Sequence, residues 1–399
     1  MSQNVLSTAI QSPFARLRTL LDGIEPGGPV IDLSIGEPKH PPPVHLMEAL
    51  DGGNAGYGKY PPINGTPELR EAIAAWIERR YGLGGKIDAE RHILPLNGSR
   101  EGLFSAMFPA IDRRHKLDRP AVLIPNPFYQ AYIAATLAAG AEPMFLDAYE
   151  ASGFLPDLDD LAKRGDLLNR TVAFYLCSPA NPQGAVADAA YLRRAIELAR
   201  KYDFLLLCDE CYSEIYCERP PAGALEVAQR DTGGLANVLA LNSLSKRSSV
   251  PGLRSGFIAG DPAFIARFSQ FRNVAAPQVP LPVQAASTAL WRDEAHVEAS
   301  RAMYAAKFDA AAAILGNRFG AVRPPGGFFL WLKMTQFGGG EAAAVTLWKE
   351  AGVKVVPGAY LTQGVGGGAD PGSAYIRIAL VQDLATTRQA LQRVVRSFP

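Results

Sequence analysis

Short apolar runs alternate with amphipathic segments between about residue 90 and residue 265. The runs lack an alternation of period two, which is typical of strands buried on both faces of a mostly parallel sheet. The segment 188–202 places Leu192, Ile196 and Ala199 on one stripe with arginines opposite, which predicts an amphipathic helix. Alternating strands and helices predict a layered α/β domain. The expected strands are 121–125, 171–177, 204–210, 237–243 and 256–261.

The pattern changes after about residue 285. The alanine-rich stretch 285–316 predicts one long helix, and the sequences GGFFLWLKM and YIRIALV predict strands on either side of a helix at 341–351. This order is typical of a smaller α+β unit. We expect an N-terminal arm and part of the small domain in 1–45, a large domain in 46–285 and the rest of the small domain in 286–399.

Composition and charge favour a small-molecule partner. The chain has 399 residues, 20% of them charged, and a formal net charge of +1 without any block of like charges, so we expect neither a nucleic-acid partner nor a membrane partner. No apolar run reaches the roughly 18 residues of a membrane helix, and the first residues lack the basic and apolar regions of a signal peptide. These features predict a cytoplasmic protein.

Four cysteines are present, and Cys208 and Cys211 form a C-x-x-C pair. Such a pair can belong to a redox centre or a zinc site, but a second pair is missing and no histidine lies nearby in sequence. Cys208 ends an apolar run, where a free thiol commonly serves as a small core residue. We therefore expect reduced thiols and no metal. The other two cysteines are Cys177 and Cys217.

Polar residues follow three of the predicted strands. Because ligands bind at the carboxyl ends of strands in such sheets, we expect these side chains to meet at one edge. Each alone has a simpler explanation, such as a turn, a helix cap or a solvated lysine; their shared position in successive units favours a binding site. They are Asn181 in SPANPQG, Asp209 and Tyr212 in DECY, and Ser243, Ser245 and Lys246 in SLSK.

These residues form a recognisable set of motifs: NP-x-G at 181–184, D-x-x-Y at 209–212, S-x-S-K at 243–246, G-x-R-x-G at 252–256 and an arginine after YI at 377. In order and spacing the set resembles the class I/II aminotransferases of fold type I. The resemblance implies the coenzyme pyridoxal 5′-phosphate. It also implies a large domain, with a mostly parallel seven-stranded sheet between helices, and a smaller α+β domain.

The resemblance implies which residues bind the coenzyme's phosphate and which lysine attaches the coenzyme covalently. Lys246 matches the lysine that forms a Schiff base, which must lose its proton and is helped by neighbouring cations such as Arg254 and Arg247. Arg254 suits a phosphate dianion because its guanidinium donates several hydrogen bonds. Backbone N–H groups at the start of the helix after LNG would complete the anion site. The matching phosphate residues are Gly98, Ser99, Arg100, Ser243, Ser245 and Arg254.

The coenzyme's ring is assigned in the same way. Asp209 matches the acid that keeps the ring nitrogen protonated, so that the ring accepts electrons from a carbanion. Tyr129 matches the aromatic residue that stacks on the ring, and Asn181 and Tyr212 match the donors to its phenolic oxygen. Tyr60 matches a tyrosine that reaches the phosphate of a neighbouring subunit, which implies a homodimer with active sites at the interface.

Arg377 matches the arginine that grips the substrate α-carboxylate, with Asn181 beside it, and Gly36 matches a position where the backbone approaches the substrate closely. The implied reaction is a ping-pong transamination between an amino acid and a 2-oxo acid, with 2-oxoglutarate as the acceptor. Lys246 moves the α-proton, and Asp209 and Tyr212 act beside it.

The run SLSKRSSVPGLRSGF is most similar to bacterial N-succinyldiaminopimelate aminotransferases of lysine biosynthesis. That substrate carries several carboxylates, for which Arg100, Arg247 and Lys39 are candidate partners. Within the same fold, the alternatives are aspartate, methionine or LL-diaminopimelate aminotransferases and C–S lyases.

Two unrelated classes fit less well. A transcription regulator with this fold needs a DNA-binding domain, for which the roughly thirty residues before VIDLSIGEP are too few. A nicotinamide dehydrogenase needs a glycine-rich fingerprint between a strand and a helix. The clusters Gly338–Gly340 and Gly366–Gly368 follow no predicted strand and open no predicted helix, so we interpret them as loops.

Overall fold

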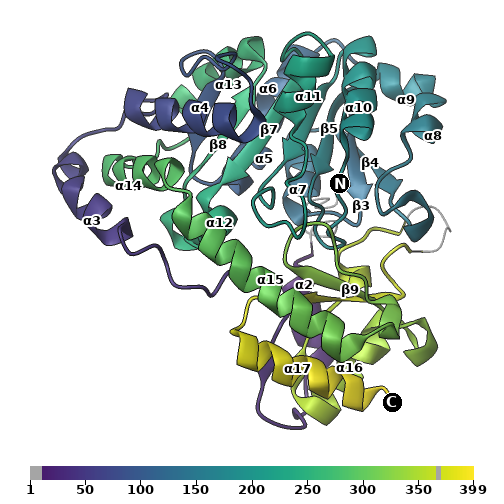
Figure 1. Cartoon of the computed structure of the whole chain (residues 1–399). Coiled ribbons are helices and arrows are strands. Elements are labelled where there is room, and N and C mark those ends of the chain that lie inside the picture. The colour runs from purple at the N-terminus through teal and green to yellow at the C-terminus, as the bar shows by residue number, and fades with distance from the viewer. Residues whose placement is uncertain (1–10, 365–369) are drawn as a thin grey trace.

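A seven-stranded sheet forms the centre of the larger part of the molecule, and a three-stranded sheet lies in the smaller part (Figure 1). The computed structural model describes residues 11–364 and 370–399. The strands are β1 Ile31–Asp32, β2 Ile93–Leu96, β3 Ala121–Asn126, β4 Glu142–Asp147, β5 Thr171–Cys177, β6 Leu205–Asp209, β7 Val238–Ser243, β8 Gly256–Gly260, β9 Phe329–Lys333, β10 Val353–Lys354, β11 Val356–Pro357 and β12 Tyr375–Ala379.

The large sheet has the strand order β2-β8-β7-β6-β5-β3-β4. Its strands run parallel except β8, which is antiparallel to both neighbours, so the prediction of a mostly parallel α/β sheet is confirmed. All five expected strands are present. The sequence pattern missed β2 and β4, because β2 is short and contains a proline, and β4 is an edge strand that is only partly buried.

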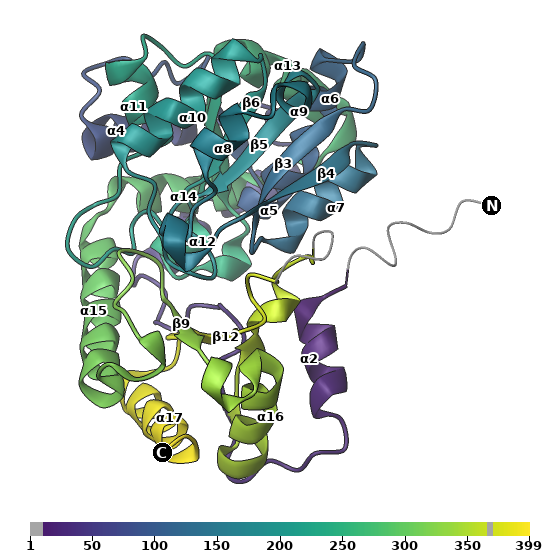
Figure 2. The same cartoon turned by 90° about the vertical axis from the view of Figure 1, so that its right-hand side faces the viewer.

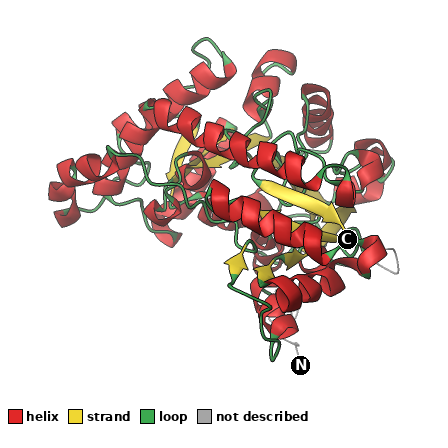
Figure 3. Ribbon diagram, turned by 60° about the horizontal axis from the view of Figure 1, so that its bottom comes forward, coloured by secondary structure: helices red, strands yellow, loops and turns green. Residues whose placement is uncertain are grey.

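Helices cover both faces of this sheet, so the strands lie between them (Figures 2 and 3). One face packs against α4, α8, α9, α10, α11 and α14, with α3 on the outer side of α14 (Figure 1), and the other packs against α5, α6, α7 and α13. The bounds are α3 Leu46–Gly52, α4 Pro67–Tyr81, α5 Ser99–Ser105, α6 Met107–Arg113, α7 Gln130–Ala138, α8 Leu158–Ala162, α9 Gly165–Asn169, α10 Ala189–Lys201, α11 Ala224–Asp231, α13 Pro262–Ala275 and α14 Leu281–Arg292.

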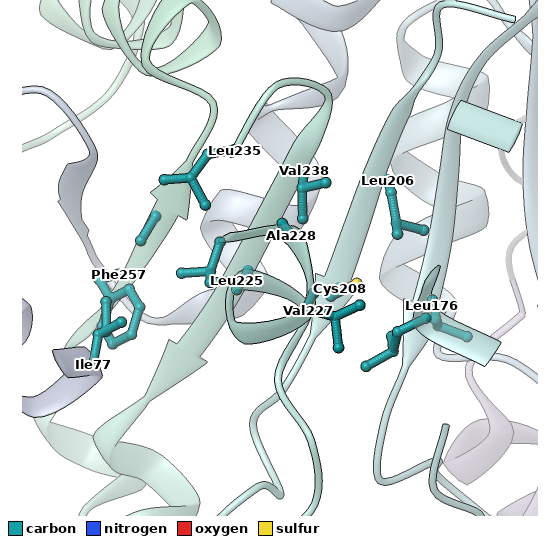
Figure 4. Packing of buried hydrophobic residues seen from close by; sticks show 14 of the residues in the cluster. Ile77, Leu176, Leu206, Cys208, Leu225, Val227, Ala228, Leu235, Val238 and Phe257 are labelled. Atoms are coloured by element: carbon teal, nitrogen blue, oxygen red, sulfur yellow. The ribbon is translucent and has the colours of Figure 1, made fainter. Parts of the chain in front are cut away.

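Alternate residues of each central strand serve the two faces. Leu206 and Cys208 of β6 pack with α11 on one face, as Figure 4 shows, whereas Leu205 and Leu207 pack on the other. Both sets are buried, which explains why the sequence shows continuous apolar runs. The expected role of Cys208 as a core residue is confirmed.

Capping residues set where the helices begin. Thr66 accepts a hydrogen bond from the N–H of Leu69 at the start of α4, and Asp188 accepts one from Tyr191 at the start of α10. The apolar stripe of α10 is buried as its pattern predicts. No helix in the described part of the chain is long and apolar enough to cross a bilayer.

The smaller part is built on the sheet β11-β12-β9, which packs against three helices. β1 pairs with β10, so the segment before residue 45 joins this part, and α2 packs on it as well. The division into domains at residues 45 and 285 remains an interpretation of this arrangement. The helices are α2 Pro13–Leu21, α15 Ala295–Leu315, α16 Gly339–Ala351 and α17 Leu384–Ser397.

Two expectations for this part are wrong. The alanine-rich stretch forms two helices, α14 and α15, because Asp293 is extended and its Oδ1 accepts the N–H of Ala295. Gly338 is the N-cap of α16, and Gly339 and Gly340 are its first two residues. A side chain on Gly340 would collide with the carbonyl oxygen of Tyr375. The cluster therefore allows the helix to approach β12 closely. Gly366–Gly368 lie outside the described residues.

Arg247 has a structural position, which contradicts its expected place at the site. It ends the short helix α12 (Leu244–Arg247), and its side chain is buried between that helix and the α14–α15 junction. Its guanidinium donates to Glu294 at 2.6 Å and to the carbonyl oxygen of Leu290 at 2.8 Å, and lies over the Trp291 ring. Arg247 is therefore neither a candidate for the distal substrate carboxylates nor part of the cationic field around Lys246.

We expect Arg247→Ala to lower the free energy of unfolding by about 2–5 kcal/mol, because it leaves a cavity in place of a buried side chain and removes its hydrogen bonds to Glu294 and to the carbonyl oxygen of Leu290. Arg79→Ala is the matched control: Arg79 also faces Glu294, but across 3.9 Å and from an exposed position, so we expect a loss of under about 1 kcal/mol. Chemical denaturation of both variants measures the difference, and equal losses would contradict this account of Arg247.

Candidate active site

A cavity of about 1170 Å³ lies at the carboxyl ends of β5, β6 and β7, between the large sheet and the small one. Residues from both parts of the molecule line it. Most residues singled out from the sequence are among them: Gly36, Ser99, Arg100, Tyr129, Asn181, Asp209, Tyr212, Ser245, Lys246, Arg254 and Arg377. The structure thus brings together side chains that are up to 341 positions apart in the chain, from 36 to 377.

Lys246 enters the cavity from α12, directly after β7. Its Nζ donates to the carbonyl oxygen of Gly36 at 2.5 Å and lies 5.4 Å from the centre of the Phe328 ring. Burial lowers the pKa of Lys246 to about 8, and the positive charges of Arg377 and Arg100 act in the same direction. The neutral, nucleophilic form of this amine is therefore far more populated near neutral pH than that of an ordinary lysine.

Asp209 ends β6 and is buried at the floor of the cavity. Its Oδ2 accepts the hydroxyl of Tyr132 at 2.8 Å, and its Oδ1 accepts the N–H of Cys211 at 3.3 Å. Burial raises the pKa of this carboxyl group. Tyr132, which is fully buried on α7 one turn beyond Tyr129, was not singled out from the sequence as a site residue. Its place on the same helix face as Tyr129 is the signal that could have identified it as the partner of Asp209.

Arg254 and Gly98 form one wall of the cavity. Arg254 has a left-handed backbone, with φ of 54°, and its guanidinium donates to the carbonyl oxygens of Pro251 and Asn97. Gly98 has φ of +84°, and a side-chain carbon there would lie 2.4 Å from Arg254 Nη2. Ser99 and Ser245 add hydroxyl groups beside this cation. The wall is therefore suited to an anion with several oxygen atoms.

Ser243 supports this wall from behind and does not line the cavity. Its Oγ lies 2.8 Å from Ser245 Oγ and 3.1 Å from the carbonyl oxygen of Ser255, and it caps α12 by accepting the N–H of Ser245. Ser243 was expected from the sequence to lie at the phosphate; in the structure its hydroxyl contacts Ser245, which lines the cavity. Gly98 likewise shapes the wall without contributing lining atoms.

Arg377 is buried on β12 with uncharged partners. Its Nη1 donates to Asn181 Oδ1 at 2.9 Å, its Nη2 donates to the carbonyl oxygen of Ser34 at 2.6 Å, and its Nε has no hydrogen-bond partner among the described residues. Burial lowers the pKa of Arg377 to about 10, so the group stays cationic at neutral pH. A buried cation without a bonded carboxylate is suited to an anionic ligand.

Aromatic rings shape the rest of the site. Arg100 Nε donates a hydrogen bond to the hydroxyl of Tyr129. Tyr212 packs edge-on against Phe328 and Phe329. Burial raises the pKa of Tyr212 well above its ordinary value, so its hydroxyl remains a donor. Gly36 lies against Phe329: a side-chain carbon there would be 2.8 Å from the ring, so the close approach seen within the chain is to Phe329.

Lys39 and Tyr60, which were singled out from the sequence, also lie outside this cavity. Lys39 is exposed and does not line it, which contradicts its expected place at the mouth. Tyr60 is 99% exposed, between the last residue of a 3-10 turn at Gly58 and the start of α4, and makes no contribution to the cavity of its own chain. Cys211 was expected to be an ordinary thiol, yet it lines the cavity and its Sγ donates to Ser99 Oγ at 2.9 Å.

Comparison with known proteins defines the class. The family model described as aminotransferase class I and II matches residues 28–394. The chain is 35% identical to a 4-dedimethylamino-4-oxo-anhydrotetracycline transaminase of Streptomyces rimosus, over 88% of this chain and 89% of that protein. It is 31% identical to an LL-diaminopimelate aminotransferase of Syntrophobacter fumaroxidans, over 92% and 91%.

Solved structures agree with this result. An aminotransferase from Neisseria meningitidis superimposes with a TM-score of 0.93 at 40% identity, covering 100% of both chains. A probable N-succinyldiaminopimelate aminotransferase from Thermus thermophilus gives 0.83 at 26% identity, covering 97% of this chain and 100% of that one. The chain belongs to the class I and II aminotransferases, which are of fold type I and depend on pyridoxal 5′-phosphate.

The cavity fits this coenzyme on its own geometry. An anion wall at Arg254, an amine of lowered pKa at Lys246 and a buried carboxylate at Asp209 line the same space. They match the phosphate, the aldehyde and the ring nitrogen of the coenzyme in chemical type. Arg377 adds a separate cation for a substrate carboxylate.

The amine of Lys246 is expected to titrate near pH 8 in the coenzyme-free protein. Its pKa is lowered, so the neutral form rises as the pH passes through 8, whereas an ordinary lysine requires about pH 10.4. Competitive acetylation at a series of pH values, read by mass spectrometry, measures the midpoint. Lys333 is the internal reference, because its bond to Glu150 raises its pKa. A Lys246 midpoint at or above that of Lys333 would contradict the burial argument.

Gly98→Ala is expected to weaken coenzyme binding at least tenfold, because the new carbon strains the backbone and displaces Arg254. Gly233→Ala is the matched control: Gly233 has φ of +79° but no atom within 4 Å of the added carbon. Equilibrium titration of both coenzyme-free variants with pyridoxal 5′-phosphate gives the dissociation constants. An unchanged constant for Gly98→Ala would show that this wall does not bind the phosphate.

Proposed function

We propose that this aminotransferase transfers the amino group of N-succinyl-LL-2,6-diaminopimelate to 2-oxoglutarate in lysine biosynthesis. The observation that carries the reaction type is the cavity itself, in which Lys246, Asp209 and Arg377 converge. A transamination requires an amine that binds the coenzyme and moves a proton, a carboxylate at the coenzyme's ring nitrogen and a cation for the substrate carboxylate, which are the roles of Lys246, Asp209 and Arg377. Pyridoxal 5′-phosphate, when bound, stabilises the carbanion left by loss of the α-proton.

Each polar residue takes a role that its surroundings support. Asp209 holds the protonated ring nitrogen, and the hydroxyl of Tyr132 fixes its carboxylate. Asn181 and Tyr212 donate to the coenzyme's phenolic oxygen, and Tyr129 covers the ring. The phosphate is bound by the wall of Gly98, Ser99, Arg100, Ser245 and Arg254, with Ser243 behind Ser245.

Lys246 serves as the group that moves the α-proton. Its lowered pKa makes the amine a usable base near neutral pH, and it can return the proton once it is charged. Arg377, with Asn181 beside it, holds the α-carboxylate, and Gly36 lets the backbone lie close to that carboxylate. The orientation of the α-carbon toward Lys246 then follows from the grip at Arg377.

The exposure of Tyr60 supports a dimeric assembly. Its ring is fully exposed on its own chain, which fits a residue that reaches the phosphate of a second subunit. We therefore propose a homodimer with active sites at the interface, located in the cytoplasm. Tyr57, three residues earlier, is 68% exposed, which is consistent with burial in such an interface.

The substrate assignment draws on charge and on similarity. Arg100 lines the cavity, is exposed, and is bonded to a tyrosine rather than to an acid, so it can meet a distal carboxylate of the succinylated substrate. The Thermus thermophilus neighbour bears the corresponding name. Relatives named LL-diaminopimelate aminotransferase make LL-diaminopimelate the second candidate donor.

With 2-oxoglutarate as acceptor, we expect kcat/KM for N-succinyl-LL-2,6-diaminopimelate to exceed that for LL-diaminopimelate, aspartate, methionine and cystathionine at least tenfold. Arg377→Gln should lower kcat/KM for the best donor about 100-fold, because a charge-assisted bidentate contact is lost. Steady-state assays on coenzyme-loaded enzyme measure both effects.

Arg323→Gln is the control for loss of one guanidinium, since Arg323 pairs with Asp309 on the surface. It should leave kcat/KM unchanged. A preference for another donor would contradict the substrate assignment. Activity of the Arg377→Gln variant equal to that of the parent enzyme would contradict the role of Arg377 in binding the substrate carboxylate.

A further inference from the structure

A buried polar cluster lies outside the cavity, on α15. His40 and Lys307 are 9% and 2% exposed, and Lys307 Nζ lies 2.7 Å from His40 Nε2. The other ring nitrogen, His40 Nδ1, lies 3.1 Å from Ser300 Oγ. α15 runs between the two parts of the molecule (Figures 1 and 2), so the cluster sits where a single contact can affect both.

The positive charge of Lys307 sets which atom donates in each hydrogen bond of the cluster. A lysine ammonium has only donors, so His40 Nε2 accepts and Nδ1 carries the proton donated to Ser300. Burial, together with the charge of Lys307, lowers the pKa of His40 to about 4, so the ring is neutral at ordinary pH. The cluster is therefore a fixed, directional link between two chain segments.

Lys307 holds a third segment. Its Nζ also donates to the carbonyl oxygen of Leu380 at 3.2 Å, and the N–H of Leu380 donates to Phe328 at 2.9 Å. Leu380 follows β12, which carries Arg377. Burial lowers the pKa of Lys307 to about 8, against the opposing effect of Asp383, so the amine is mostly charged at neutral pH. No carboxylate bonds Lys307 within residues 11–364 and 370–399, and Asp383 instead caps α17. Lys307 thus joins α15, the end of β12 and the segment of His40.

The segment that ends at His40 touches both cations of the active site. The carbonyl oxygen of Ser34 accepts Arg377 Nη2 at 2.6 Å, and that of Gly36 accepts Lys246 Nζ at 2.5 Å. The other end of the segment is fixed at Leu33, whose backbone bonds Lys354 and Ala379. His40 is the buried anchor at the second end.

An aromatic stack makes a second connection. The His40 ring lies 4.4 Å from the Tyr304 ring, and Tyr304 stacks on Phe328 with centres 5.4 Å apart. Phe328 is the ring beneath Lys246 Nζ. Displacement of His40 would therefore disturb the Phe328 ring beside Lys246 as well as the segment 34–36.

We propose that His40 and Lys307 are positioning residues for transamination. Their bond fixes residues 34–36, so that the Ser34 carbonyl aims Arg377 at the substrate carboxylate and the Gly36 carbonyl aims Lys246 at the α-carbon. The inference rests on the roles proposed for Arg377 and Lys246, and it extends the working site to two side chains that do not line the cavity.

The test compares His40→Leu, which removes both hydrogen bonds, with His40→Gln, whose amide oxygen can still accept from Lys307. For the best donor of the substrate panel, His40→Leu should raise KM for donor and 2-oxoglutarate about tenfold and lower kcat by a smaller factor, because the carboxylate grip loses its aim. His40→Gln should restore most of the loss. Lys307→Met should behave like His40→Leu, and it replaces that variant in the test if His40→Leu does not fold.

A second readout needs no coenzyme. Amide hydrogen exchange of the peptide 33–41 in the coenzyme-free protein should be about tenfold faster in His40→Leu and close to that of the parent protein in His40→Gln. Phe308→Leu is the control for general destabilisation: Phe308 is buried on the same helix and packs in the core of the small sheet. It should leave both KM and this peptide unchanged.

Unchanged KM and exchange in His40→Leu would overturn the proposal. The same KM rise in Phe308→Leu would also overturn it, since the effect would then be a loss of stability. Failure of the active-site roles is a separate result, because it shows in Arg377→Gln, whatever His40 does.

Discussion

The structure gathers cationic side chains in one cavity without bonding them to acids. Lys246 is held by a carbonyl oxygen, Arg254 by two carbonyl oxygens, and Arg377 by an amide and a carbonyl among the described residues. Burying charge without a counterion is costly, so the surrounding fold must supply the stability. The site is left ready for anions, here a phosphate and a carboxylate.

That requirement explains the architecture around the site. The parallel strands β5, β6 and β7 bring Asn181, Asp209 and Lys246 to one edge, because each residue follows the carboxyl end of its strand. The small sheet then supplies Arg377 from the opposite side. The segment at residues 34–36 joins both sets through its carbonyl oxygens, which makes its own anchoring at His40 a condition for the geometry.

Sequence reasoning was most reliable for residues tied to a strand end. The motifs around Asp209, Lys246 and Arg254 predicted that these residues share a site, since their order along the chain matches their order in the sheet. Sequence reasoning failed to separate two arginines whose side chains point in different directions. Arg247 is next to Lys246 in sequence, but its side chain points into the α14–α15 junction, whereas that of Arg254 lines the cavity. Successive side chains of a helix point to different faces, and the residue types alone do not show which face lies toward the cavity.

The sequence by itself determined the layered α/β class, the central strands and the family, because buried strands and strand-end motifs leave local signals. Only the tertiary structure decided that Tyr132 fixes Asp209, that Ser243 supports Ser245 from behind, and that His40 meets Lys307. These pairs join residues whose local sequences carry no sign of each other. Their contact exists only once the sheet and helices have packed, since it depends on distances between elements far apart in the chain.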